Sequence, residues 1–156
     1  MSEAQQPMFS IEKIYVKDLS LEVPGGPQTF MQSEQPQLEI QIAHRSERVN
    51  DGLFEVTLAV TVTAKLGDKT AFLVEVSQAG VFQIRNIAEA DLAAVLGIGC
   101  PSVLFPYARE TVSDVISRAG FPPLLLAHVN FEALFQQQRT GQSAAQADSS
   151  RIEIAH

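Results

Sequence analysis

The chain has 156 residues, with 18 acidic and 11 basic side chains and a formal net charge of −7. This length fits a single domain with its own hydrophobic core. The negative charge argues against binding to nucleic acid or to an anionic membrane surface, because phosphate groups need clusters of Lys and Arg. It is compatible with a basic protein partner.

The single Cys100 cannot form an internal disulfide bond, and a lone Cys usually packs as a small apolar side chain. The first ten residues lack the basic and apolar regions of a signal peptide. No run of apolar residues approaches the roughly 20 that span a bilayer. These features predict a cytoplasmic protein with no direct membrane insertion.

The composition divides the chain into three parts. Residues 1–8 are polar and predict a flexible N-terminus, and residues 9–140 predict a single domain. Residues 141–156 are rich in Gln, Ser and Ala, and they predict a disordered tail.

The first half of the domain alternates between apolar and polar residues, which is the period of β-strands. The four predicted strands cover residues 9–23, 38–48, 54–63 and 70–84. A loop at Pro24-Gly25-Gly26-Pro27 separates the first two, and the turn signals Asn50-Asp51-Gly52 and Leu66–Lys69 separate the others. Short connections of this kind predict an antiparallel sheet with a meander-like order.

After Asn86 the apolar residues recur with a helical period. The pattern predicts a short helix over 89–96 that ends near Gly97, and a longer helix over 107–119 before Gly120 and two prolines. Asn130 is placed to cap a final helix. Strands followed by helices predict the α+β class, with the C-terminal helices packed on one face of the sheet.

The sequence carries no motif that requires an enzyme, a metal or a cofactor. His44, His128 and His156 lack metal-ligand spacing, and neither a nucleophile elbow nor a phosphate-binding loop is present. The alternative is a small α+β enzyme or ligand-binding domain with polar groups converging on a pocket between sheet and helices. Its candidate residues are Tyr107, Arg109, Glu110 and His128.

Two strands predict an acidic face. Asp18 and Glu22 share a face of the first strand, and Leu73 and Glu75 share a parity in the fourth. Because the helices cover only one side of the sheet, the other side is open to water. The face is therefore either an ordinary solvated surface or a docking surface for a basic partner, with Leu73 as an apolar anchor.

Three Pro-rich or loop-like segments are unusually apolar: 29–31, 105–107 and 121–126. Loops are normally polar because they run over the surface. These segments either close over the end of the core or line a groove for extended apolar polypeptide. The candidate groove residues are Phe30, Met31, Phe105, Tyr107, Phe121, Leu124 and Leu126.

Four blocks of sequence carry a family resemblance. They are Ile14-Tyr15-Val16-Lys17-Asp18-Leu19-Ser20-Leu21-Glu22, Thr70-Ala71-Phe72-Leu73-Val74-Glu75-Val76, Leu104-Phe105-Pro106-Tyr107-Ala108-Arg109-Glu110 and Val129-Asn130-Phe131-Glu132-Ala133-Leu134-Phe135. They occur in the order found in SecB, the bacterial protein-export chaperone family, within residues 9–136. By these blocks the chain resembles SecB.

The resemblance implies a homotetramer, a dimer of dimers, that binds unfolded precursors without ATP. It also implies delivery of the precursors to the SecA motor, whose basic, zinc-binding C-terminal tail would hold any metal. The implied SecA-binding face is Asp18, Glu22, Leu73 and Glu75, and the residues implied to influence subunit assembly are Val74, Val76 and Gln78. SecB-like proteins also serve toxin–antitoxin systems, which is an alternative function.

The chain departs from the family pattern in its ending, Ser150-Arg151-Ile152-Glu153-Ile154, which is less uniformly polar than a family tail, and at two places within the domain. The family often has a Trp after the Pro-Gly loop, whereas this chain has no Trp and carries Ser33-Glu34-Gln35-Pro36 there. His128 stands where a Pro is usual before Val-Asn-Phe. Both departures within the domain fall near the candidate groove.

Overall fold

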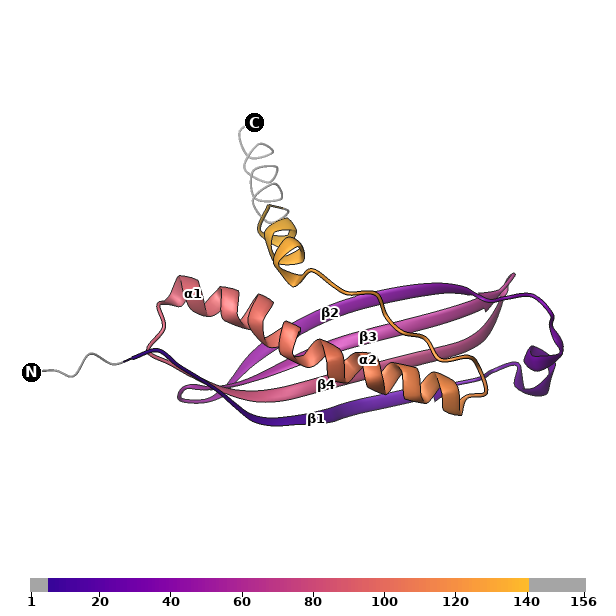
Figure 1. Ribbon diagram of the computed structural model, residues 1–156, viewed down its shortest axis with the longest axis horizontal. Helices are drawn as coiled ribbons and strands as arrows, with labels where there is room; N and C mark the ends of the chain where they lie inside the picture. The colour runs from indigo at the N-terminus through magenta and orange to yellow at the C-terminus, as the bar shows by residue number, and fades with distance from the viewer. Residues whose placement is uncertain (1–5, 141–156) are drawn as a thin grey trace, which may run out of the picture.

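A computed structural model describes residues 6–140, so the predicted tail (141–156) and most of the predicted N-terminal segment lie outside the described residues. Four long strands form one sheet, and a long interrupted helix crosses it diagonally (Figure 1). The elements are β1 Met8–Glu22, β2 Gln37–Asn50, β3 Leu53–Leu66, β4 Lys69–Arg85, α1 Glu89–Ala94 and α2 Cys100–Arg118.

The predicted α+β class and four-stranded antiparallel sheet are confirmed, but the strand order is not a simple meander. The order is β1-β4-β3-β2, so β1 pairs with the last strand rather than with β2. Two-residue turns join β2, β3 and β4, with Gly52 and Gly67 at positive φ. The Pro-Gly segment instead leads into a 3-10 helix, Gly26–Met31, within a connection long enough to reach the opposite edge.

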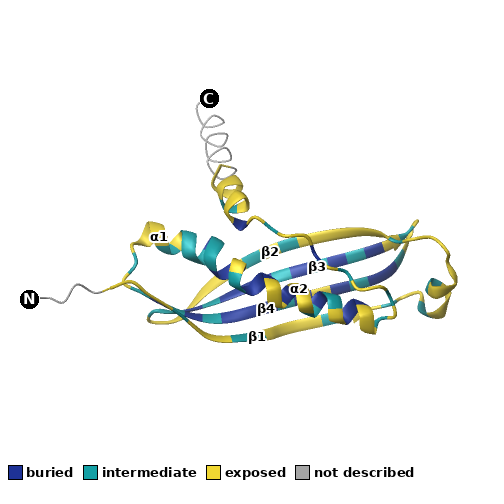
Figure 2. Cartoon of the chain, viewed as in Figure 1, coloured by how far each residue is buried: buried dark blue, intermediate teal, exposed yellow. Residues whose placement is uncertain are grey.

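The core lies between the two central strands and α2. Alternate residues of β3 and β4 face the helix and are buried, while much of β1 and β2 at the sheet edges is exposed (Figure 2). Helix α2 contributes eight buried residues: Cys100, Pro101, Leu104, Phe105, Ala108, Val112, Val115 and Ile116. Val74, Val76 and Gln78 of β4 are buried on this side as well.

The prediction that helix stops near Gly97 and begins again at Tyr107 is wrong. The helix continues from α1 through a π-helical turn, Val95–Gly99, directly into α2. Pro101 lies just after the π-helical turn, at the start of α2. Pro106 lies inside the helix, and burial of the surrounding apolar residues against the sheet outweighs its helix-breaking tendency.

The continuous helix Glu89–Arg118 has 30 residues and is long and apolar enough, by length and composition, to cross a membrane. Because a break was predicted near Gly97, the sequence did not suggest one helix of this length, and a core helix of a folded domain meets the same criterion. The apolar residues of the Glu89–Arg118 helix pack against β3 and β4, as expected for a core helix of a folded domain.

The predicted cap of the last helix is confirmed. The Asn130 side-chain oxygen accepts a hydrogen bond from the Ala133 amide at 3.0 Å, and residues 131–140 are helical. This helix points away from the sheet (Figure 1). It contacts the rest of the domain at Gly97, where an added Cβ would lie 2.7 Å from Cδ2 of Phe135.

Candidate docking face and client groove

An acidic patch, formed by Asp18, Glu22, Leu73 and Glu75, lies on the face of the sheet opposite the helices. In the β1–β4 pair, Glu22 lies opposite Leu73 and Ser20 lies opposite Glu75. Side chains directly opposite one another in an antiparallel pair project to the same face. The three carboxylates are exposed and Leu73 is half-buried between them. The four predicted residues are thus neighbours on one surface.

Glu39 extends the acidic patch across the whole sheet, and the sequence analysis missed it. Leu73 lies opposite Thr63 of β3, and Thr63 lies opposite Glu39 of β2. The alternation with Leu38 and Ile40 indicates that Glu39 faces outward. Which residues lie beside Glu39, however, depends on the order of the strands in the sheet, and the alternation within one strand does not reveal that order.

The carboxylates of the acidic patch are available to a basic partner. The ion pairs within residues 6–140 are Lys17–Glu55, Arg85–Asp51 and Arg118–Asp114. None of these involves the patch. The hydroxyl of Ser20 donates a hydrogen bond to Oε2 of Glu75 at 3.4 Å, which orients that carboxylate without neutralising it.

A separate polar cluster borders the patch at Tyr15, Lys17 and Glu55. Lys17 Nζ lies 2.5 Å from Oε1 of Glu55, and the Tyr15 hydroxyl donates to Oε2. The hydrogen bonds from Lys17 and Tyr15 lower the pKa of Glu55. Burial, together with the hydrogen bond and charge of Glu55, raises the pKa of Tyr15 to about 12. The positive charge of Lys17 is therefore held by Glu55.

An aromatic shelf, formed by Phe30, Phe72 and Phe121, lies at the end of the sheet beside the 3-10 helix. The ring centroids of Phe30 and Phe121 are 5.1 Å apart, and those of Phe72 and Phe121 are 4.6 Å apart. Phe72 is buried, whereas Phe30 is 52% exposed and the adjacent Met31 is 84% exposed. The shelf therefore exposes apolar surface to water at Phe30, and the buried ring of Phe72 lies beneath it.

The other predicted groove residues fall in different environments. Phe105 and Leu126 are buried in the core, and residues 105–107 belong to α2 rather than to a loop. Leu124 is half-buried and packs against the core, whereas Tyr107 is 48% exposed on α2. The aromatic contacts found in residues 6–140 do not join Tyr107 to the shelf. Only Phe30, Met31 and Phe121 thus gather at one exposed site.

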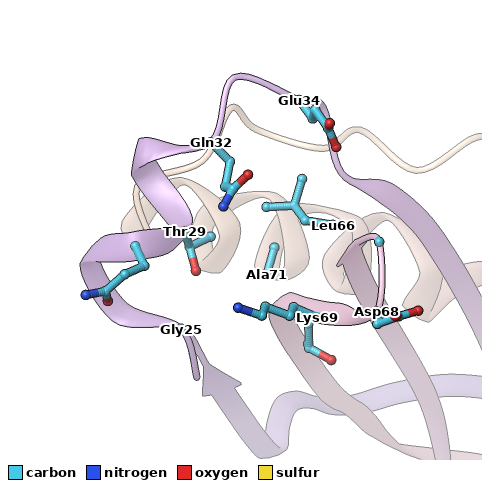
Figure 3. Close-up of a pocket in the computed structure, with 11 residues that line it drawn as sticks. Gly25, Thr29, Gln32, Glu34, Leu66, Asp68, Lys69 and Ala71 are labelled. Carbon is cyan, nitrogen blue, oxygen red and sulfur yellow. The ribbon is translucent and has the colours of Figure 1, made fainter.

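The region where the family often has a Trp borders an open hollow of about 560 Å³ with a mixed polar and apolar lining (Figure 3). It lies between the 3-10 helix and the β3–β4 turn, and Glu34, Thr29 and Lys69 are among its lining residues. In the figure the Lys69 amine points toward the Thr29 side of the hollow, whereas Glu34 lies at its far rim. His128 packs edge-on against Phe105, with ring centroids 6.4 Å apart.

The residues of the enzyme alternative do not converge on one cavity. Arg109 and His128 line a hollow of about 180 Å³, and Glu110 lines a separate one with Arg109. Tyr107 lines neither. In the described part of the chain, no group of three or more His, Cys, Asp or Glu could hold a metal ion.

Comparison with known proteins identifies the family. The family model described as "Preprotein translocase subunit SecB" matches residues 2–142. A "Protein-export protein SecB" of Chromobacterium violaceum is 63% identical over 93% of this chain and 98% of its own length. The protein of the same name from Aromatoleum aromaticum is 59% identical over 98% of this chain and 97% of its own length.

A solved structure agrees with the fold. A SecB-like chaperone of Mycobacterium tuberculosis, in complex with a ChAD peptide from an antitoxin, superposes with a TM-score of 0.60 at 21% identity. The match covers 78% of this chain and 90% of the other. At this identity the similarity concerns the fold alone, whereas the export proteins are similar over nearly the whole sequence. The chain therefore belongs to the SecB family of protein-export chaperones, which bind preproteins and are not enzymes.

Proposed function

We propose that the chain is a cytoplasmic holdase that keeps preproteins unfolded without ATP and delivers them to SecA. The acidic patch is the observation that carries the delivery step. Its carboxylates surround Leu73 on a helix-free face and have no basic partner within residues 6–140. A small basic domain, such as the zinc-binding tail of SecA, complements both the charge and the apolar centre of this patch.

The aromatic shelf is the proposed client site. Phe30 and Met31 offer exposed apolar side chains, and Phe72 and Phe121 support them from the core side. An open shelf accepts many sequences, because it imposes little shape on its ligand. Several such shelves on one oligomer would hold a long client firmly, although each contact alone is weak.

An uncovered apolar strip supports the proposed homotetramer, arranged as a dimer of dimers. The strip lies on the helix side of β1, which α2 does not cover, and consists of Phe9, Ile11, Val16, Leu19 and Leu21. Contiguous exposed apolar surface of this kind marks protein interfaces. Val74 and Val76 lie opposite Leu21 and Leu19 in the β1–β4 pair, so an influence on assembly would act through the strip.

The SecA assignment is tested by neutralising the patch. The triple variant Asp18→Asn, Glu22→Gln, Glu75→Gln should bind SecA at least about tenfold more weakly, since charge pairs at an interface are worth more than 1 kcal/mol in sum. The matched control removes three exposed carboxylates on the helix side: Glu89→Gln, Asp91→Asn, Glu110→Gln. Calorimetric titration with SecA should leave the control unchanged. Equal losses in both variants would attribute binding to net charge and contradict the patch.

The client assignment is tested at the shelf. Phe30→Ser with Met31→Ser should reduce the ability of the protein to delay refolding of a denatured precursor, because both side chains are exposed and apolar. Leu125→Ser removes an apolar side chain of 66% exposure elsewhere and serves as the control. SecA binding should persist in all these variants. Full suppression of refolding by the shelf variant would contradict the assignment.

A further inference from the structure

A β-bulge in β1 sets the face on which the acidic patch appears. Val16 lies opposite Gln78 and Asp18 lies opposite Ser77, so Lys17 is an extra residue in β1. Such a residue shifts the alternation of every side chain that follows it. Tyr15 and Asp18 share the outer face for this reason, although they are three positions apart.

Without the bulge, the two halves of β1 would be in conflict. If Tyr15 kept its position, regular alternation would turn Asp18 and Glu22 toward the helix side and Leu19 toward water. The acidic patch therefore depends on this one local irregularity. Any contact that stabilises the bulge therefore also keeps Asp18 and Glu22 on the outer face.

Gln78 is the residue that reaches the bulge from the core. Its side chain is only 3% exposed, and its Nε2 donates to the backbone carbonyl of Tyr15 at 3.2 Å. The Thr111 hydroxyl of α2 lies 3.3 Å from Oε1 of Gln78, but that hydroxyl has one proton and a closer acceptor, the Tyr107 carbonyl at 2.9 Å. The bond to Tyr15 is therefore the stronger anchor of the Gln78 amide.

The opposite side of the bulge is fastened as well. Lys17 itself pairs with Glu55, which also accepts the hydrogen bond from Tyr15. An amide in an apolar core is unfavourable unless it is hydrogen-bonded. Gln78 is buried on the helix side of β4, where Met or Leu would avoid that cost. What the Gln78 amide provides, and an apolar side chain would not, is the hydrogen bond to the Tyr15 carbonyl beside the bulge.

We propose that Gln78 is a positioning residue for the acidic patch: its amide fixes the Tyr15 carbonyl and so maintains the bulge that presents Asp18. The proposal rests on the proposed function in that the patch is taken to bind SecA. This role differs from the influence on subunit assembly that the family resemblance implies for Gln78, because the hydrogen bond between Gln78 and Tyr15 lies within one chain.

The test combines Gln78→Met with neutralisation of the patch carboxylates of one strand at a time. Met keeps the side-chain length and removes the amide donor. Gln78→Met should accelerate hydrogen exchange of the backbone amides of residues 15–18 and weaken SecA binding roughly three- to tenfold, the size of one lost hydrogen bond. Thr111→Val, which removes only the weaker contact, should have little effect on either measurement.

Double variants separate positioning from general damage. In a background with Asp18→Asn and Glu22→Gln, Gln78→Met should weaken SecA binding no further, because both carboxylates that follow the bulge in β1 have already been neutralised. In a Glu75→Gln background the full loss should remain, since Glu75 belongs to β4 and does not follow the bulge. Equal additional losses in both backgrounds would overturn the proposal. Gln78→Asn, which retains an amide with shorter reach, replaces Gln78→Met if the latter does not fold.

Two further outcomes separate the positioning role of Gln78 from a role in assembly and from the assignment of the acidic patch to SecA. A lower mass in solution with unchanged exchange at residues 15–18 would assign Gln78 to assembly and overturn the positioning role. If neither the double variant Asp18→Asn, Glu22→Gln nor Glu75→Gln weakens SecA binding, the docking assignment fails on its own. Hydrogen exchange then decides the role of Gln78: faster exchange in Gln78→Met supports it, and unchanged exchange overturns it.

Discussion

The ion pair between Lys17 and Glu55 offers a quantitative test of how the outer face of the sheet is stabilised. We expect Lys17→Met to lower the free energy of unfolding because it leaves the Glu55 carboxylate, whose side chain is 15% exposed, without its cation. At 2.5 Å the Coulomb attraction is roughly 2 kcal/mol in water and roughly 7 kcal/mol at an effective dielectric constant of 20.

The net contribution of the Lys17–Glu55 pair to stability is much smaller than these Coulomb energies. The Lys17 side chain is 37% exposed, so water screens the charge, and fixing a long side chain costs conformational entropy. Exposed pairs contribute about 0.2–1 kcal/mol, and breaking a fully buried pair costs about 3–5 kcal/mol. For this half-exposed pair we expect a coupling energy of about 1 kcal/mol.

A double-mutant cycle measures that energy. The variants are Lys17→Met, Glu55→Gln and their combination, unfolded in urea at pH 7 and at matched protein concentration, since oligomerisation adds to apparent stability. The cycle should give about 1 kcal/mol at pH 7 and less in acid, once the pH is low enough to protonate Glu55, whose pKa is lowered by its hydrogen bonds from Lys17 and Tyr15. A coupling energy below about 0.3 kcal/mol at pH 7, within the usual error of additivity, would refute the reasoning.

Two further predictions concern stability and local order. Gly97→Ala should release the helix of residues 131–140, because the new Cβ would lie 2.7 Å from the Phe135 ring; faster amide exchange confined to that helix checks this, and unchanged exchange would contradict the contact. Tyr15 has a folded-state pKa of about 12 against an ordinary value of 10.0, so its contribution to stability is complete below pH 10 and is lost as the pH rises toward 12. Urea unfolding between pH 9 and 12 should show this loss in the native protein, and Tyr15→Phe should lack it.

The sequence predicted much of the fold because its strands follow simple alternation. The placement of Asp18, Glu22, Leu73 and Glu75 on the face opposite the helices needed only the parity of β4, the parity of the part of β1 that follows the bulge, and helices on one side. The strand order could not be obtained in this way. Parity is a local property, whereas the pairing of β1 with β4 depends on how apolar surface is shared across the whole sheet.

The bulge of β1 leaves a signal in the sequence. The helix-side apolar residues are Ile14 and Val16 before the bulge at Lys17 but Leu19 and Leu21 after it, so their parity changes from even to odd. A change of apolar parity within one strand marks an inserted residue. The signal locates the bulge at Lys17 or its neighbour without identifying Gln78 as its partner.

The groove was predicted less well because proline was interpreted as a local signal. Phe105-Pro106-Tyr107 looks like a loop in isolation, yet neighbouring residues on both sides bury against the sheet and keep the segment helical. Phe105 and Leu126 consequently serve the core. The exposure of Phe30 and Met31 could be predicted from the sequence, because they follow a Pro-Gly segment that does end a strand; their role in client binding stays a prediction.

The pairing of β1 with β4 also affects how the chain folds. Met8 must find Arg85, and Glu22 must find Leu73, so β1 can complete its pairing only after the rest of the sheet has been synthesised. Strands β2, β3 and β4 can form from tight turns, which is fast, whereas closing the long loop to β1 is slow. During that interval the nascent chain exposes an unpaired, apolar strand. Like the unfolded preproteins that SecB proteins bind, it is then incompletely folded and has apolar side chains open to water.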